Sequence, residues 1–325
     1  MTNDPSVSNE DIFDAIRDTE RDGLLADRQA DGLSGLSGKR TVGLLQRLTR
    51  VFRETEDACY LEVGVFRGLT LVSAALEAGD MPCFGIDNFA TLDPDGVNRG
   101  IVEDRIEKFR AVNAKLINSD FEQALERLGD YIGERRVCVY LIDGPHDYRS
   151  QLICLTLIQP FLHENAVIVI DDANYPDVRW STRDFLLGFP EFRLAFDAYS
   201  PDHPANLTGS DKTDAENRWL NGIHVLVRDS EGTLDRMLPP VDEFERKIYL
   251  NEWLAHRLRL ADLAPEALSL ADAILRGDEE GEMSLRERLT TAYMSRKPVY
   301  DGLHGDRNVY SKDLPSVRFN AGLLT

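Results

Sequence analysis

Residues 60–68 constrain the fold of this chain more than any other stretch. An apolar segment over 58–63 contains Glu62 and runs into Gly64 and Gly68, and a helix-compatible segment follows at once. Glycine lets the backbone turn tightly and approach a ligand that a Cβ atom would keep at a distance. A strand, a glycine turn and a helix in this order are typical of a nucleoside-binding βαβ unit.

The next apolar run supports the same interpretation. It covers 82–87 and ends in Asp87, which lies 25 residues after Glu62. An acidic residue at this point of a βαβ unit is placed to accept hydrogen bonds from ribose hydroxyls.

Apolar and helix-compatible segments alternate through the middle of the chain. The pattern predicts strands over 58–63, 82–87, 115–118, 137–142 and 166–171, with helices at 68–79, 101–111, 121–129, 147–163 and 177–187. Strands 137–142 and 166–170 are apolar throughout, which is typical of strands that helices cover on both faces. We therefore expect an α/β fold with a doubly wound, mostly parallel sheet. Two further strands, at 193–199 and 222–228, are joined by a polar loop and are expected to pair antiparallel, which makes seven strands.

The two ends of the chain differ from this middle part. Residues 1–55 contain two helix-compatible segments separated by a glycine- and serine-rich hinge at 32–38. Residues 230–325 show helical periodicity without strand signals, and their last thirty residues look irregular. We expect three parts: an N-terminal helical segment (1–55), a sheet domain (56–229) and a C-terminal helical region (230–325) for oligomerisation or for covering the site.

The composition of the chain indicates which kinds of partner and which cellular environment to expect. The 325 residues carry a formal net charge of −20, so phosphate backbones and anionic lipid surfaces are disfavoured as partners. The N-terminal residues lack the basic and apolar regions of a signal peptide, and no apolar run approaches the roughly 20 residues that span a bilayer. All four cysteines lie in apolar segments and are expected to be buried in a reducing environment. We expect a cytoplasmic protein.

Acidic residues follow all five of the parallel strands. Because the carboxyl ends of parallel strands meet at one edge of a sheet, these side chains should converge there. They are Glu62, Asp87, Asp120, Asp143 and the pair Asp171 and Asp172. Asp143, Asp171 and Asp172 would repel one another without a cation, and oxygen ligands favour a hard ion such as Mg²⁺ or Ca²⁺. The alternative is that Asp171 or Asp172 caps a helix and that Asp143 holds a turn.

His146 follows Asp143 by three residues. A neutral imidazole beside a metal is suited to accept the proton of a substrate hydroxyl, which makes His146 a candidate general base. The alternative is a histidine that caps the helix beginning near Asp147. His224 lies in an apolar strand and is expected to be a core residue.

Over about 56–229 the chain resembles the class I S-adenosylmethionine-dependent methyltransferases, which have a Rossmann-like fold. The stretch Leu-Glu-Val-Gly-Val-Phe-Arg-Gly-Leu-Thr is similar to the first motif of the catechol O-methyltransferase branch. The resemblance implies that the methionine end of the cofactor is lined by Glu62, Gly64, Phe66, Gly68 and Thr70. It also implies that Asp87, with Asn88, holds the ribose, and that the adenine lies near Ser119, Asp120 and Phe121.

The same resemblance extends to a metal site. In the catechol branch an Asp after the fourth strand and a pair after the fifth bind Mg²⁺, and the matching positions here are Asp143, Asp171 and Asp172. Asp143 would then border both the cofactor and the metal. Where catechol-type enzymes place a lysine base, this chain has His146, as do the metal-dependent sugar O-methyltransferases of macrolide biosynthesis.

These expectations define a leading hypothesis. It is Mg²⁺-dependent O-methylation, with S-adenosylmethionine as methyl donor, of a small polyhydroxylated acceptor such as a sugar or a glycosylated natural product. One alternative is a metal-independent O- or N-methyltransferase, because the sequence Asp-Gly-Pro-His at 143–146 superficially resembles the Asp-Pro-Pro-Tyr motif of amino-methylating enzymes. Another is a catalytically inactive cofactor-binding partner protein. A homo-oligomer is possible, and neither nucleic acid nor membrane is expected as a partner.

Overall fold

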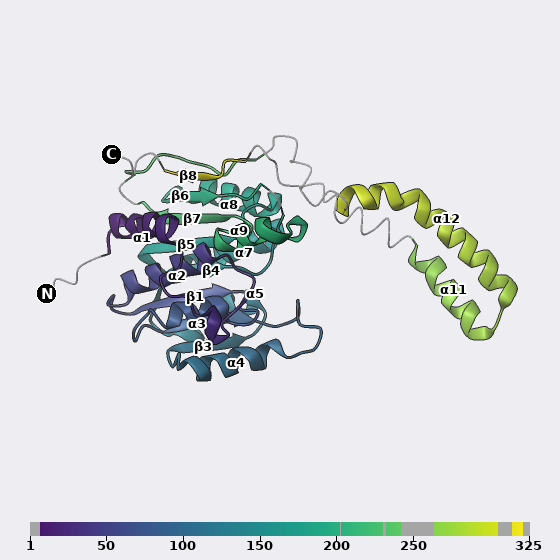
Figure 1. The fold of residues 1–325 in the computed structure, drawn as a ribbon, viewed down its shortest axis with the longest axis horizontal. Coiled ribbons are helices and arrows are strands. Elements are labelled where there is room, and N and C mark those ends of the chain that lie inside the picture. Colours follow the sequence, from purple (N-terminus) through teal and green to yellow (C-terminus); the bar gives the residue numbers. More distant parts are fainter. Residues whose placement is uncertain (1–6, 202, 230–231, 242–262, 305–313, 321–325) are drawn as a thin grey trace. The chain divides into compact units, whose positions relative to one another are not determined.

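The computed structural model describes residues 7–201, 203–229, 232–241, 263–304 and 314–320 (Figure 1). They belong to two compact units. One consists of Met1–Pro240 together with Tyr310–Thr325, and the other is Val241–Val309. The first unit contains the sheet and the candidate site.

The first unit is built on an eight-stranded sheet with the order β3-β2-β1-β4-β5-β7-β6-β8. The strands are β1 Ala58–Val63, β2 Cys83–Asp87, β3 Ala114–Asn118, β4 Arg136–Ile142, β5 Leu162–Asp171, β6 Phe192–Ala198, β7 Ile223–Arg228 and β8 Val317–Phe319. Strands β1 to β5 are mutually parallel, whereas β7 runs antiparallel to β5 and β6. The strand order reverses between β1 and β4, the point at which a doubly wound sheet opens a crevice for ligands. The predicted α/β class and the antiparallel ending are confirmed.

Helices cover both faces of the sheet. In this unit they are α1 Asn9–Asp22, α2 Lys39–Phe52, α3 Leu69–Ala75, α4 Asn98–Phe109, α5 Phe121–Glu126, α6 Leu128–Ile132, α7 Tyr148–Leu157, α8 Pro176–Gly188 and α9 Gly209–Asn217. Two apolar clusters form the core, one on each face. Neighbouring residues of β1 divide between them, since Tyr60 belongs to one cluster and Leu61 to the other. All four cysteines are buried in this core, as expected.

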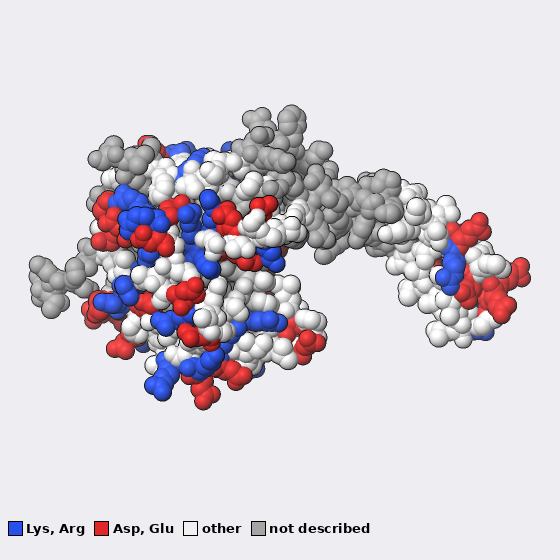
Figure 2. Space-filling view, viewed as in Figure 1, with Lys and Arg blue, Asp and Glu red and all other residues white. Residues whose placement is uncertain are grey.

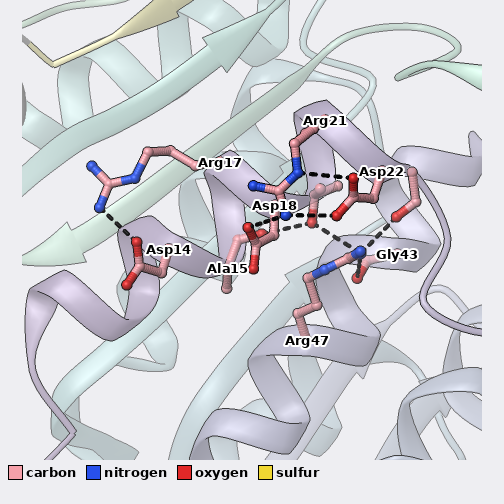
Figure 3. Close-up of polar contacts among 10 residues, drawn as sticks. Asp14, Ala15, Arg17, Asp18, Arg21, Asp22, Gly43 and Arg47 are labelled. Atoms are coloured by element: carbon pink, nitrogen blue, oxygen red, sulfur yellow. Dashed lines mark hydrogen bonds and ion pairs between the residues drawn. The ribbon is translucent and has the colours of Figure 1, made fainter.

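The N-terminal helices pack on each other through a polar network as well as apolar contacts (Figure 3). The Arg47 side chain of α2 donates hydrogen bonds to the carbonyl oxygens of Gly23, at 2.6 Å, and of Gly43, at 3.1 Å. A Cβ atom on Gly43 would lie 2.3 Å from the Gly23 carbonyl oxygen, so only glycine allows this approach of the two segments. On the exposed side of α1, Arg17 and Arg21 pair with nearby aspartates.

The sheet has one strand more than the seven predicted. β8 pairs antiparallel with β6, so part of the C-terminal stretch expected to be irregular returns to the sheet. Its Arg318 donates to the buried Asp197 of β6, with a 2.9 Å bond from Nε to Oδ1. A three-residue strand is too short to show a periodic pattern, and its position depends on this distant partner.

The polar loop predicted between β6 and β7 contains a helix. α9 has almost no amphipathic character, and Ala215 is its one buried residue, so hydrophobic periodicity did not reveal it.

The second unit is helical in its described part, with α11 Ala264–Arg276 and α12 Glu279–His304 packed against each other. The earlier part of the predicted helical pattern, from Phe244 to Leu260, lies outside the described residues. Among the residues that the structure describes, no helix is long and apolar enough to cross a bilayer. Figure 2 shows acidic and basic side chains interspersed on the visible face of the first unit.

Candidate functional site

The glycine turn after β1 follows an unusual backbone path. Gly64, Phe66 and Gly68 have φ angles of 93°, 50° and 79°, in the left-handed region that favours glycine. A Cβ atom on Gly64 would lie 2.1 Å from the Asp143 carbonyl oxygen. The ends of β1 and β4 therefore meet across Gly64 with no space for a side chain.

Asp87, at the end of β2, holds this turn in place. Its Oδ2 atom accepts hydrogen bonds from the backbone amides of Val65 and Phe66, each at 2.8 Å, and its Oδ1 atom accepts one from Phe89 at 2.7 Å. The side chain therefore couples β2 to the turn. Its predicted contact with a ribose would use the remaining lone pairs and stays a prediction.

Glu62 is fully buried below the turn. The Tyr60 hydroxyl donates to its Oε2 atom at 2.6 Å, while Oε1 has no hydrogen-bond partner among the described residues. Burial raises the pKa of Glu62 to about 8, against the opposing effect of the Tyr60 hydrogen bond. A buried oxygen without a partner is costly unless a ligand group supplies one, so Glu62 fits a site for a cationic or donor group.

The remaining residues predicted to contact the cofactor lie around the same crevice. Thr70 is buried in the first turn of α3, and Asn88 is exposed just after β2. Asp120 accepts bonds from the amides of Glu122 and Gln123, which makes it the N-cap of α5. Ser119 and Phe121, on either side of it, are partly exposed. Their roles toward a cofactor stay predictions.

The acidic residues after β4 and β5 converge with the candidate base. One ligand atom each from Asp143, His146 and Asp172 lies within 4.8 Å of the other two. His146 Nε2 is 2.6 Å from Asp172 Oδ2, and 39% of the His146 side chain is exposed. Asp171 was predicted as a third carboxylate ligand, but it is buried behind this group and does not belong to it.

Electrostatics in this group are strongly perturbed. Burial, reinforced by the Asp172 carboxylate, raises the pKa of Asp143 to about 7, and burial with both neighbouring carboxylates raises that of Asp171 well above its ordinary value. Burial lowers the pKa of His146, but the hydrogen bond to Asp172 and the charges of Asp172, Asp143 and Asp147 together outweigh it, and the pKa is raised. Burial would raise the pKa of Asp172, but the attraction of His146, together with the Asn221 hydrogen bond and the His203 imidazole, lowers it. These shifts favour an ion pair between Asp172 and His146.

The donor set of this group fits a hard divalent cation. Two carboxylates and an imidazole lie within reach of one point, and a cation there would relieve the repulsion that raises the pKa of Asp143. His146 would then be a ligand or a neighbour of the ion. Of the metal ligands predicted from sequence, the structure brings Asp143 and Asp172 together. Their role toward a metal stays a prediction, as does that of Asp171.

Aromatic side chains line the exposed side of His146. The Tyr175 ring stacks on the imidazole, with centroids 4.9 Å apart and planes inclined by 13°. The Tyr175 hydroxyl is 3.1 Å from Nε2 of His203, and the Asn221 amide donates to Asp172. These contacts fix the imidazole plane and one face of Asp172.

Sequence reasoning missed several of these positions. Tyr175 follows the acidic pair by three residues, a proximity that could have flagged it. Asn221 and Ser37 gave no local signal, because they come from distant parts of the chain. The Ser37 hydroxyl donates to Asp143 Oδ2 at 3.1 Å from a residue 106 positions earlier. The expectation that His224 is a core residue is confirmed, since it is fully buried and bonded to Tyr199 and Thr182.

Comparison with known proteins shows a similarity over the middle of the chain. Residues 61–173 match the family model described as a methyltransferase domain. Among curated proteins, no sequence matches the chain significantly.

Solved structures with a similar fold include an O-methyltransferase from Bacillus cereus in complex with S-adenosylhomocysteine, at 11% identity, covering 66% of this chain and 90% of that one, with a TM-score of 0.46. The O-methyltransferase TomG from Streptomyces achromogenes has 14% identity, coverage of 68% and 90%, and a TM-score of 0.45. CalS11, a TDP-rhamnose 3'-O-methyltransferase, has 15% identity, coverage of 56% and 87%, and a TM-score of 0.41. Likeness at this level says nothing about the substrate of this chain.

The matched region begins in β1, contains the glycine turn and Asp87, and ends just after Asp171 and Asp172. It therefore includes every strand end at which a candidate site residue was predicted. Over residues 61–173 the chain is thus similar to the methyltransferase domain family.

Proposed function

We propose that the protein is an Mg²⁺-dependent O-methyltransferase for a hydroxyl of a small polyhydroxylated acceptor, such as a sugar or a glycosylated natural product. The observation that carries this proposal is the convergence of Asp143, His146 and Asp172 within 4.8 Å, beside the glycine turn. The net charge of −20 agrees with a small-molecule acceptor and not with a nucleic acid, and we place the reaction in the cytoplasm.

The residues around the turn fit the cofactor. Gly64 lets the ends of β1 and β4 meet at the edge of the crevice, and Glu62 offers a buried oxygen without a hydrogen-bond partner among the described residues. When bound, S-adenosylmethionine would supply an electrophilic methyl group, and Asp143 and Asp172 would hold a Mg²⁺ ion able to lower the pKa of an acceptor hydroxyl. Phe66, Gly68 and Thr70 would line the methionine end, with Asp87 at the ribose.

His146 is the group that removes the acceptor proton. Only the neutral imidazole can accept a proton, and the pairing with Asp172 favours the protonated form, so the competent form is favoured as pH rises. Tyr175 keeps the ring in one plane, which orients the imidazole for this transfer. Positioning of the acceptor hydroxyl against a fixed base would supply much of the acceleration.

A metal-independent methyltransferase is a second candidate because of one specific contact. The 2.6 Å bond between His146 and Asp172 forms a base with its orienting carboxylate, an arrangement that can act without an ion. In that case Asp172 serves His146 and is not a metal ligand.

Methyl transfer to a panel of vicinal diols and aminodiols tests the proposal, with release of S-adenosylhomocysteine as the readout. We expect turnover on a diol with Mg²⁺, its loss with a chelator, and its loss in Asp172→Asn. The matched control is Asp147→Ser, which removes a carboxylate beside His146 yet keeps a residue able to cap α7. Turnover that survives the chelator would favour the metal-independent candidate.

A further inference from the structure

A segment ahead of the methyltransferase domain lies over the candidate site. We call residues 31–38 the strap. A Cβ atom on Gly35 would lie 2.7 Å from Cβ of Leu69, the first residue of α3, so the strap backbone packs directly behind the glycine turn. Two residues later Ser37 donates to Asp143 after β4. The strap therefore passes from the end of β1 to the end of β4, the two strands that border the ligand crevice.

The strap follows a fixed path. Leu33 is buried in the core, and a Cβ atom on Gly38 would lie 2.3 Å from the Arg218 carbonyl oxygen. The amide of Arg40 donates to the same carbonyl at 3.2 Å. Both ends of the strap are thus anchored, and only the short stretch between them can be moved by changes at the site.

Arg105 of α4 connects the strap to the glycine turn. Its guanidinium donates to the carbonyl oxygens of Ser34 at 2.7 Å, Gly32 at 3.1 Å and Arg67 at 2.6 Å. The first two belong to the strap, and Arg67 belongs to the turn. Asp87 of β2 accepts hydrogen bonds from the backbone amides of the same turn. The turn is therefore held at its N–H groups by β2 and at the Arg67 carbonyl oxygen by α4.

The chemistry of this contact requires arginine. All three acceptors are uncharged carbonyl oxygens in different directions, which a planar guanidinium with five N–H donors can serve at once. A lysine ammonium is a single point donor on a flexible stem and would reach fewer of them. Without the side chain, three carbonyl groups at the exposed edge of the strap and the turn would lose the donor that joins them.

We propose that Arg105 is a positioning residue that locks the strap against the glycine turn and so makes the strap one wall of the S-adenosylmethionine site. This inference rests on the proposed function in one respect, namely that the ligand of the glycine turn is S-adenosylmethionine. The Arg105 guanidinium is bonded to backbone carbonyl oxygens of the strap and the turn, so Arg105 would act through these two segments. It acts by keeping the turn in the shape that receives the methionine end and by keeping Ser37 beside Asp143.

The test is calorimetric binding of S-adenosylhomocysteine to the full-length wild type, Arg105→Met, Arg105→Lys and Arg99→Met. Arg99 lies on the same helix, is 55% exposed and pairs with Glu103, so its variant controls for the loss of a charge on α4. We expect Arg105→Met to bind about tenfold more weakly or worse, the effect of losing one charge-assisted hydrogen bond, with Arg105→Lys intermediate and Arg99→Met unchanged.

Two further readouts separate positioning from folding. Thermal unfolding without ligand reports a merely structural role, which would lower the transition temperature but leave affinity intact. Trypsin cleavage after Arg28 or Lys39, next to the strap, should be faster in Arg105→Met than in Arg99→Met. Unchanged affinity in folded Arg105→Met would overturn the inference while the proposed function stands. If the wild type itself does not bind S-adenosylhomocysteine, the proposed function falls and this inference falls with it.

Discussion

Replacement of Gly64 by alanine is a sharp test of the packing between β1 and β4. At a φ of 93° an alanine costs about 1–2 kcal/mol in backbone strain. Its Cβ atom would also lie 2.1 Å from the Asp143 carbonyl oxygen, far inside van der Waals contact, and overpacking of this kind adds about 1–3 kcal/mol. We expect a total loss of about 2–5 kcal/mol in the free energy of unfolding, together with a strong loss of affinity for S-adenosylhomocysteine.

Gly96→Ala is the matched control. Gly96 also has a positive φ, 66°, but nothing lies within 4 Å of the position that a Cβ atom would take. The free energy of unfolding of this variant should fall only by the backbone strain of about 1–2 kcal/mol, and its affinity for S-adenosylhomocysteine should be unchanged. Urea unfolding followed by far-ultraviolet circular dichroism measures both free energies. If Gly64→Ala is as stable as Gly96→Ala and binds the ligand equally well, the close approach at Gly64 does not shape the site.

Two other perturbations have defined outcomes. Arg318→Met leaves the buried Asp197 without its cation, so the free energy of unfolding should fall by about 3 kcal/mol, and an unchanged urea midpoint would show that β8 does not hold the sheet edge. For Glu62, the pKa of about 8 in the folded chain exceeds its ordinary value, so the folded state binds the proton more tightly and the wild type should lose stability as pH rises from about 4.5 to 8. That loss is about 5 kcal/mol at most and should be absent in Glu62→Gln, as urea titrations at several pH values would measure.

Much of the sheet could be predicted because its signals are local. Each parallel strand is an apolar run that stops at an acidic residue, and the shared geometry of strand ends then brings those residues together. Asp143, His146 and Asp172 were found in this way, although they belong to two different strand ends. To predict this convergence it was enough to know that the strands are parallel, which the alternation of strands and helices indicates.

The rest depends on contacts between distant and irregular segments. Ser37 reaches Asp143 across 106 positions, and the strap that carries it has no periodic pattern. Strand β8 is placed by the pairing of Arg318 with Asp197, which is 121 positions away.

The most direct measurement is a calorimetric titration of Mg²⁺ into protein saturated with S-adenosylhomocysteine, for the wild type and Asp172→Asn. The account predicts binding of the cofactor product, then about one ion per chain in the wild type and none in the variant. Cofactor binding without any ion would contradict the metal site and leave the pairing of His146 with Asp172 as the basis of catalysis.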